Sequence, residues 1–353
     1  MQKTIGGMQK AVRDGCDREL LDIFRLFYND VPISFEIIDT SRGDADFRET
    51  VIAEFETGEK SVLKLADNDF TFPEKIEVWR RTAEEYRTAG YYCPKIFPDK
   101  AGNYPVVRYK GHSCISYAED FSPYRPAEYR SENASEEIPA AEYEKEAWIM
   151  TAKIASKYFS YTDYPSAYCL FETFCPSDKT DEVLENTLEW KKYAQTLPEE
   201  FRPQTERIWR LWTENRKKLE LIYKKLPTSV FQADLNSTNI LLDGSGKFVG
   251  VYDFNLCGKD VFLNYLFRET FYDDYKKELD AIFRRLKIVS EYYHFSEVEK
   301  QAALMLYRCL KPLWYNKLER LKELGNDTAA VGAYLNETER SLTEDIDFTL
   351  YMN

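Results

Sequence analysis

The sequence predicts an α+β protein of two lobes, a small antiparallel sheet followed by a larger, mainly helical region. Short apolar runs of strand type are concentrated before residue 121, and apolar positions recur at helical spacing from about residue 140. The segment between them is rich in Pro, Ser and charge, which is typical of a boundary. We therefore expect an N-terminal lobe over 1–121 and a helical lobe over 122–353.

The N-terminal lobe begins with a helix and then changes to strands. Residues 18–27 carry apolar side chains at helical spacing, and three short runs with strand character follow Pro32. The second and third runs are joined by a four-residue turn at 57–60, which indicates a hairpin. The three predicted antiparallel strands are 33–39, 50–56 and 61–66.

One helix is predicted after the third strand. Pro73 suits its first turn and Gly90 suits its C-terminal cap. Two more strands are expected at 104–111 and 113–121. The apolar face of the helix consists of Ile76, Trp79, Ala83 and Tyr86.

The second lobe is chiefly helical, and its clearest helix covers 205–226. The exception is the stretch 228–253, which has the pattern of a short strand, a loop and a hairpin around the turn 244–246.

Composition limits the function. The formal net charge of -13 argues against a nucleic-acid partner; it is best explained by solubility and mildly favours a cationic small molecule. With two histidines, a multi-imidazole metal site or a catalytic triad is nearly excluded. The seven cysteines form no C-x-x-C pair, so reduced thiols are expected. Without an apolar leader or an apolar stretch of membrane length, we expect a cytoplasmic protein with no membrane partner; the oligomeric state stays open.

The strongest signal is an aspartate, an amide and a second aspartate around one predicted hairpin. In phosphoryl transfer one carboxylate accepts or orients the proton of the attacking hydroxyl, while an amide oxygen and another carboxylate hold Mg²⁺ against the nucleotide phosphates. In chain order these roles fall to Asp234, Asn239 and Asp253.

The pattern D-x-x-x-x-N-I-L followed by D-F resembles the catalytic loop and metal-binding motif of kinases. Its surroundings are similar to the aminoglycoside phosphotransferase and choline kinase family. The resemblance implies a protein-kinase-like fold, ATP or GTP with Mg²⁺, and transfer of a phosphoryl group to a hydroxyl of a small acceptor. Gln232 replaces the usual histidine, and Asn255 replaces a glycine or an acid. We expect Gln232 to hydrogen-bond the loop backbone instead.

The same resemblance assigns nucleotide-binding residues in the first lobe. Lys64 resembles the lysine on the third strand of kinases, and alternation puts Val62 on its face of the strand, over the base. The loop 40–45 stands where phosphates would be covered, with Ser41 and Gly43 as its polar and flexible residues.

Two further assignments complete the predicted nucleotide site. The strand ending at Glu119 and Phe121 would present backbone groups to the base. The helix 73–90 would supply a glutamate to steady Lys64, and of its four candidates we choose Glu77.

Three functions remain open: a small-molecule kinase, a catalytically weak kinase-like protein that binds nucleotide as a scaffold, and a metal-dependent hydrolase that uses the same acids without nucleotide. The acids within 269–280 would suit a cationic acceptor, such as an aminoglycoside or an amino alcohol, but a solvated helix face is the preferred interpretation, so no acceptor residues are assigned.

Overall fold

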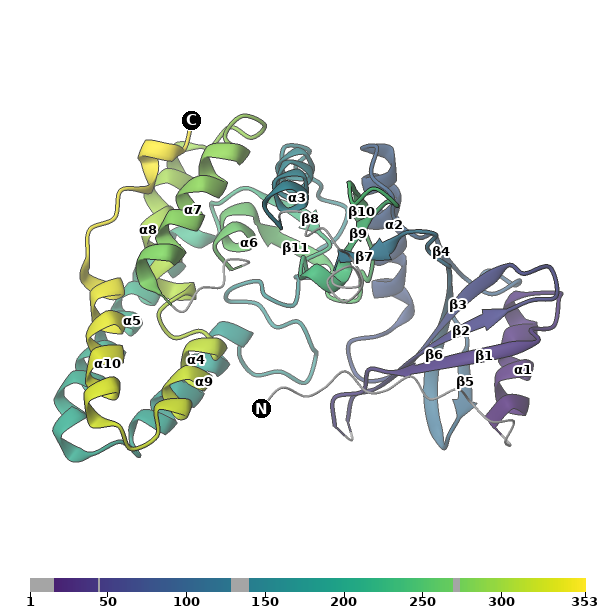
Figure 1. Ribbon diagram of the computed structural model, residues 1–353, viewed down its shortest axis with the longest axis horizontal. Helices are drawn as coiled ribbons and strands as arrows, with labels where there is room; N and C mark the ends of the chain where they lie inside the picture. Colours follow the sequence, from purple (N-terminus) through teal and green to yellow (C-terminus); the bar gives the residue numbers. More distant parts are fainter. Residues whose placement is uncertain (1–15, 44, 128–139, 269–273) are drawn as a thin grey trace. The chain divides into compact units, whose positions relative to one another are not determined.

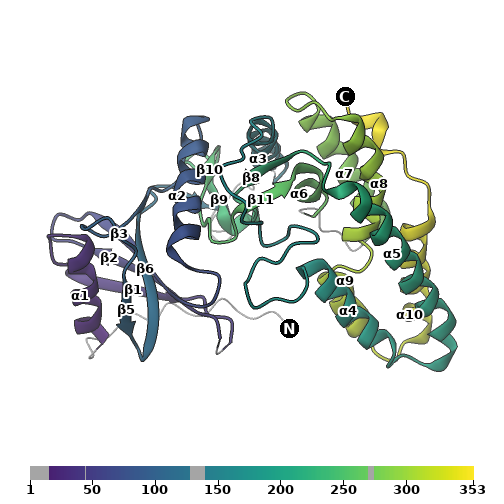
Figure 2. The same cartoon turned by 180° about the vertical axis from the view of Figure 1, so that it is seen from behind.

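The computed structural model describes residues 16–43, 45–127, 140–268 and 274–353 (Figures 1 and 2). These residues form two compact units and confirm the α+β fold class. Of the described residues, the first unit comprises 16–43, 45–127, 175–177 and 237–255, and the second comprises 140–174, 178–236, 256–268 and 274–353. The division differs from the predicted boundary after Phe121, because the hairpin that carries Asn239 and Asp253 packs with the first unit.

The first unit is built on a six-stranded antiparallel sheet in the order β1-β2-β3-β6-β4, with β5 paired to β6. The predicted strands are all present. The unpredicted strand β4 is two residues long, too short to show a period-2 pattern. The bounds are β1 Ser34–Asp39, β2 Phe47–Glu54, β3 Lys60–Asp67, β4 Ile96–Phe97, β5 Val106–Tyr109 and β6 His112–Asp120.

Helix α1 (Cys16–Phe27) covers one face of this sheet (Figure 1). Its Leu20 and Phe24 are fully buried in one core with Leu63 and Leu65 of β3. Because side chains alternate along a strand, the residues between these leucines point to the opposite face. Lys64 therefore projects away from α1.

Helix α2 (Pro73–Thr88) packs through the predicted apolar face, and Gly90 has φ +94°, a left-handed conformation suited to a helix end. The Trp79 ring lies 5.9 Å from that of Tyr117 on β6. The rotation of α2 is thus fixed by aromatic packing against the sheet.

A second, three-stranded sheet completes the first unit. Strand β9 (Ile240–Leu242) pairs with β10 (Phe248–Val251) and with β7 (Arg125–Pro126). Gly250 lies against Tyr92, and a Cβ added at this glycine would lie 1.8 Å from the Tyr92 carbonyl oxygen. This close approach holds the hairpin that carries Asn239 and Asp253.

The second unit is helical around a two-stranded sheet of β8 (Thr228–Phe231) and β11 (Gly258–Val261). The predicted helix at 205–226 is confirmed as α5, whose buried Trp212 donates its indole N–H to the Cys309 carbonyl at 2.9 Å. The described helices of this unit are α3 Ala140–Ala155, α4 Glu182–Ala194, α5 Arg202–Tyr223, α6 Phe262–Arg268, α7 Tyr275–Val289, α8 Glu297–Leu310, α9 Tyr315–Leu324 and α10 Thr328–Thr343, with 3-10 turns at Glu199–Phe201 and Phe348–Tyr351. A further 3-10 turn, Ser237–Asn239, belongs to the first unit.

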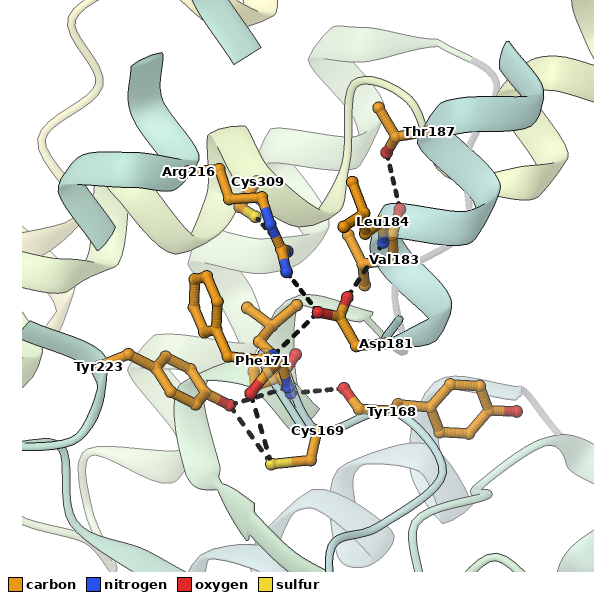
Figure 3. A network of polar contacts seen from close by, with 12 residues as sticks. Tyr168, Cys169, Phe171, Asp181, Val183, Leu184, Thr187, Arg216, Tyr223 and Cys309 are labelled. Carbon is orange, nitrogen blue, oxygen red and sulfur yellow. Dashed lines mark hydrogen bonds and ion pairs between the residues drawn. The ribbon is translucent and has the colours of Figure 1, made fainter. Parts of the chain in front are cut away.

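An aspartate ties the loop before α4 to α5 (Figure 3). Asp181 caps α4 by accepting the Leu184 N–H at 3.0 Å, accepts the Phe171 N–H at 2.9 Å and pairs with Arg216. The same loop is held by the Tyr223 hydroxyl, which accepts the Leu170 N–H at 3.2 Å. These bonds hold the loop before α4 against α5, the helix that precedes β8 in the chain.

Two composition-based expectations concern the chain as a whole. The described cysteine side chains are free thiols, all buried except Cys175. No helix in the described ranges combines the length and the apolar character that crossing a bilayer requires.

Candidate functional site

Lys64 and Asp253 meet in the first unit. The Lys64 Nζ lies 3.7 Å from the Asp253 Oδ1, and the side chains are 17% and 26% exposed. Burial lowers the pKa of Lys64, but the negative charges of Asp253 and Glu119 outweigh it, so the net pKa is raised. Lys64 therefore keeps its positive charge, and its side chain is partly accessible to solvent.

The hairpin positions two oxygen donors. Asn239 directly precedes β9 and is 6% exposed, and its backbone carbonyl accepts the Tyr252 N–H at 3.2 Å, next to Asp253. Asp253 has φ +60°, and the Asn255 side-chain amide donates to its Oδ2 at 3.4 Å. A left-handed aspartate is costly unless its surroundings impose it, and such residues cluster at functional sites.

The donor chemistry of this hairpin suits Mg²⁺. One carboxylate and one amide oxygen are hard ligands, and Mg²⁺ in proteins usually keeps waters and binds substrate phosphates beside one or two carboxylates. The described part of the chain holds no cluster of three or more His, Cys, Asp or Glu residues that would cage a metal alone. The residues thus fit a cation shared with a phosphate ligand.

Glu119 faces the same side of the sheet as Lys64. It is the Cα partner of Val62 across the β3–β6 pair, while Lys64 is opposite Tyr117. Glu119 is only 6% exposed. Its pKa is raised to about 7 in total: burial is the largest cause, the positive charge of Lys64 lowers the pKa, and the negative charges of Asp253 and Asp120 raise it. The sequence analysis used only the backbone of Glu119, although strand alternation through Val62 and Lys64 already indicates that its side chain shares their face.

The raised pKa of Glu119 predicts a pH-dependent stability. The unfolded carboxyl ionises near 4.5, so its favourable contribution is complete below that pH and is lost as pH rises toward 7. At about 1.4 kcal/mol per pH unit the loss is roughly 3 kcal/mol. Glu119→Gln, which cannot ionise, should therefore gain about that much unfolding free energy relative to wild type between pH 4.5 and 8.

Chemical denaturation at the two pH values measures this difference. The matched control is Glu77→Gln, which replaces a half-exposed glutamate of the same unit whose pKa is lowered, mainly by its hydrogen bond with Arg80. A Glu119→Gln advantage that does not grow with pH contradicts the assignment.

The other residues predicted to bind nucleotide are Val62, Phe121, Ser41 and Gly43. Val62 is 9% exposed on the Lys64 face, and Phe121 is 39% exposed beyond the end of β6. In the loop 40–45, the Ser41 hydroxyl exchanges hydrogen bonds with the Arg48 backbone at 3.0 and 3.3 Å, and Gly43 has φ +81°. Asp44 lies outside the described residues. The loop is a closed turn whose serine hydroxyl already has partners.

Glu77 does not pair with Lys64. Its carboxylate lies 2.5 Å from Arg80 and accepts from the Tyr104 hydroxyl at 3.2 Å. The physical reason is the rotation of α2, since packing of Trp79 against Tyr117 turns Glu77 toward solvent. The ion pair of Lys64 is with Asp253 instead.

The second unit holds the predicted catalytic aspartate. Gln232 is fully buried, and its side-chain Oε1 accepts the Asp234 N–H at 2.8 Å, so the expected bond from this glutamine to the loop backbone is present. The Asp234 Oδ1 accepts from the Asn236 amide at 2.8 Å. Gln232 thus holds the backbone of Asp234, and Asn236 holds its carboxylate.

Arg268 is a further residue of this loop that the sequence analysis missed. It is 2% exposed, donates to the Ala233 carbonyl at 2.6 Å and stacks 3.8 Å from the centroid of the Tyr168 ring. Ala233 has φ +72°. Arg268 therefore holds the strained residue that precedes Asp234. No local pattern marked this arginine, which lies 34 residues further along the chain.

Two of the described acids of 269–280 already have partners. Asp274 caps α7 by accepting the Lys277 N–H at 2.8 Å, and the buried Glu278 lies 3.4 Å from Lys311 and 3.7 Å from Lys317. Residues 269–273, with Glu269 and Asp273, lie outside the described residues. The described acids named here thus serve the helix and a buried charge network.

The sequence comparison supports the family resemblance over one part of the chain. Residues 167–264 match the model of the phosphotransferase enzyme family, APH. This range includes Asp234, Asn239 and Asp253 but stops short of Lys64. No curated protein matches the chain in sequence.

Solved structures extend the likeness in fold to most of the chain. A microcompartment-associated aminopropanol kinase has a TM-score of 0.58 at 13% identity, covering 92% of this chain and 94% of its own. An amicoumacin kinase in complex with AMP-PNP, Ca²⁺ and Ami has a TM-score of 0.54 at 16% identity, covering 94% and 96%. At this identity the likeness concerns the fold, and it confirms the predicted kinase-like architecture.

Proposed function

We propose that the protein is a cytoplasmic, Mg²⁺-dependent small-molecule kinase that transfers the terminal phosphoryl group of ATP or GTP to a hydroxyl of its acceptor. The observation that carries the proposal is the ion pair between Lys64 and Asp253, whose Nζ and Oδ1 atoms lie 3.7 Å apart. Asp253 lies at one end of the hairpin whose other end holds Asn239. Phosphoryl transfer requires a cation, metal ligands and a base rather than a covalent nucleophile.

The roles divide as follows. Lys64 would bind phosphate oxygens, and Asn239 and Asp253 would hold Mg²⁺, which neutralises charge on the phosphates when bound. Asp234 would accept or orient the proton of the acceptor hydroxyl. Val62, Glu119, Phe121 and the loop with Ser41 and Gly43 would surround the nucleotide.

An amino alcohol or amino sugar is the acceptor class we favour. The chain carries 61 acidic against 48 basic residues, which attracts cations. Two structures of similar fold are an aminopropanol kinase and an amicoumacin kinase. The class is therefore small, hydroxylated and cationic.

An acceptor screen tests the proposal. ADP release from ATP, and GDP release from GTP, are followed with Mg²⁺ and a panel of amino alcohols, amino sugars and neutral sugars, with water alone as the blank. We expect acceptor-dependent release with at least one amine-bearing compound. Tight nucleotide binding without release for any compound would favour the scaffold function, and Mg²⁺-dependent phosphatase activity without a thermal shift with ATP would favour the hydrolase.

A further inference from the structure

Lys64 requires a second counter-charge in the proposed reaction. Its ion pair in the structure is with Asp253. Asp253 is also a proposed metal ligand, so a bound cation would compete for the same carboxylate. A largely buried ammonium without a counter-charge is costly. Another carboxylate must then hold it toward the phosphates.

Two of the four candidate glutamates of helix α2 are paired with arginines of the same helix. Glu77 is paired with Arg80 at 2.5 Å and Glu84 with Arg87 at 2.5 Å. The face that α2 turns to the sheet places Trp79 against Tyr117, the residue directly opposite Lys64. An aromatic pair thus occupies the position that a helix glutamate would need.

Glu119 has the properties of the missing counter-charge. It shares the Lys64 face of the sheet and lies one step diagonally from Lys64 across the β3–β6 register. The residue is only 6% exposed to solvent. Within the described residues its carboxylate accepts no hydrogen bond from the protein, and Lys64 is the cation that stabilises its ionised form. A buried acid with no hydrogen-bond donor costs stability unless it serves a charge partner.

We propose that Glu119 on β6, in place of the predicted Glu77 of α2, positions the Lys64 ammonium when Asp253 binds a metal cation. This inference rests on the proposed function. Glu119 and Asp253 both stabilise the charge of Lys64, and they repel each other. When a cation neutralises Asp253, the repulsion between the two carboxylates is removed, and Glu119 remains as a negative charge for Lys64. Asp120, which also repels Glu119, is the other acid in range.

A double-mutant cycle on nucleotide binding tests the positioning role. AMP-PNP affinity with Mg²⁺ is measured by calorimetry for wild type, Glu119→Gln, Lys64→Met and the double variant, with Glu77→Gln as the matched control. Glu119→Gln should weaken binding about tenfold, in the middle of the range for coupled neighbours. The double variant should bind no more weakly than Lys64→Met, because Glu119 acts through Lys64. Glu77→Gln should bind like wild type.

A spectroscopic arm tests the pairing without nucleotide. The side-chain ammonium resonance of Lys64 is observed in protein labelled with ¹⁵N-lysine and assigned by its loss in Lys64→Met. In Asp253→Asn, which imitates an Asp253 without charge, we expect the resonance to persist, and in Asp253→Asn/Glu119→Gln we expect it to disappear through exchange with water. Persistence in that double variant overturns the proposal, as does additivity in the binding cycle. A wild type that binds no AMP-PNP overturns the proposed function, and the resonance then decides the Lys64–Glu119 pairing by itself.

Discussion

Asp234→Asn should lower the turnover number for phosphoryl transfer by about 10² to 10⁴ while nucleotide affinity stays near that of wild type. The carboxylate is assigned to the acceptor hydroxyl, and general-base or orienting contributions have this size. Its neighbours Gln232 and Asn236 hold the loop through bonds to the Asp234 N–H and Oδ1. Asn is nearly isosteric and keeps an oxygen acceptor there, so the loop should remain folded.

Steady-state kinetics and a parallel binding titration measure the two quantities separately. The matched control is Asp163→Asn, which removes an exposed aspartate from the same unit and should turn over like wild type. Equal melting temperatures would exclude misfolding. If Asp234→Asn transfers phosphate as fast as wild type, the catalytic loop has been misinterpreted.

Asp253→Asn should abolish the Mg²⁺ dependence of nucleotide binding and lower turnover by at least about 10²-fold. The substitution removes the charged metal ligand. The two amide side chains that remain, the introduced asparagine and Asn239, are neutral and bind Mg²⁺ poorly. Asn is preferred to Ala for this test because residue 253 has φ +60°, a conformation that Asn tolerates better than most residues. The substitution therefore isolates the charge from backbone strain.

Nucleotide titrations with and without Mg²⁺ measure this effect. Asp243→Asn is the matched control, because Asp243 lies in the turn of the same hairpin, and an asparagine there keeps an oxygen that can accept the N–H groups of Ser245 and Lys247. It should leave both binding and turnover unchanged. Unaltered Mg²⁺ dependence in a folded Asp253→Asn protein would reject the metal role.

The sheet and the long helices were predictable because their periodicity is set by burial. The strands 50–56 and 61–66 alternate because one face packs under α1, and α5 shows an apolar stripe because it packs in the second unit. Strands β4 and β7 have two residues each and carry no period. Their existence depends on partners distant in sequence.

The site was predictable where chemistry is local in sequence. Asp234, Asn239 and Asp253 occur in a spacing that a single loop and hairpin can hold. Arg268 was not predictable, since its contact with Ala233 depends on where α6 ends in space. The partner of Lys64 was missed because sequence does not fix the rotation of α2, although its apolar stripe through Trp79 already excluded Glu77 from the buried face.

The assignment of Asp253 to the first unit could not be predicted from the sequence. The hairpin follows β8 closely along the chain, so the prediction assigned both to the helical lobe. Pairing of β9 with β7 and the approach of Gly250 to Tyr92 bring the hairpin to the first unit. Such pairings link segments more than 100 residues apart in the chain and leave no mark in local composition.

The most direct test of the central claim is ³¹P NMR of wild type incubated with ATP, Mg²⁺ and an amino alcohol acceptor. The account predicts loss of the γ-phosphate signal with appearance of a phosphomonoester signal on the acceptor, and no such signal with Asp234→Asn in the same time. Growth of inorganic phosphate alone, at the same rate with and without every acceptor tried, would contradict it.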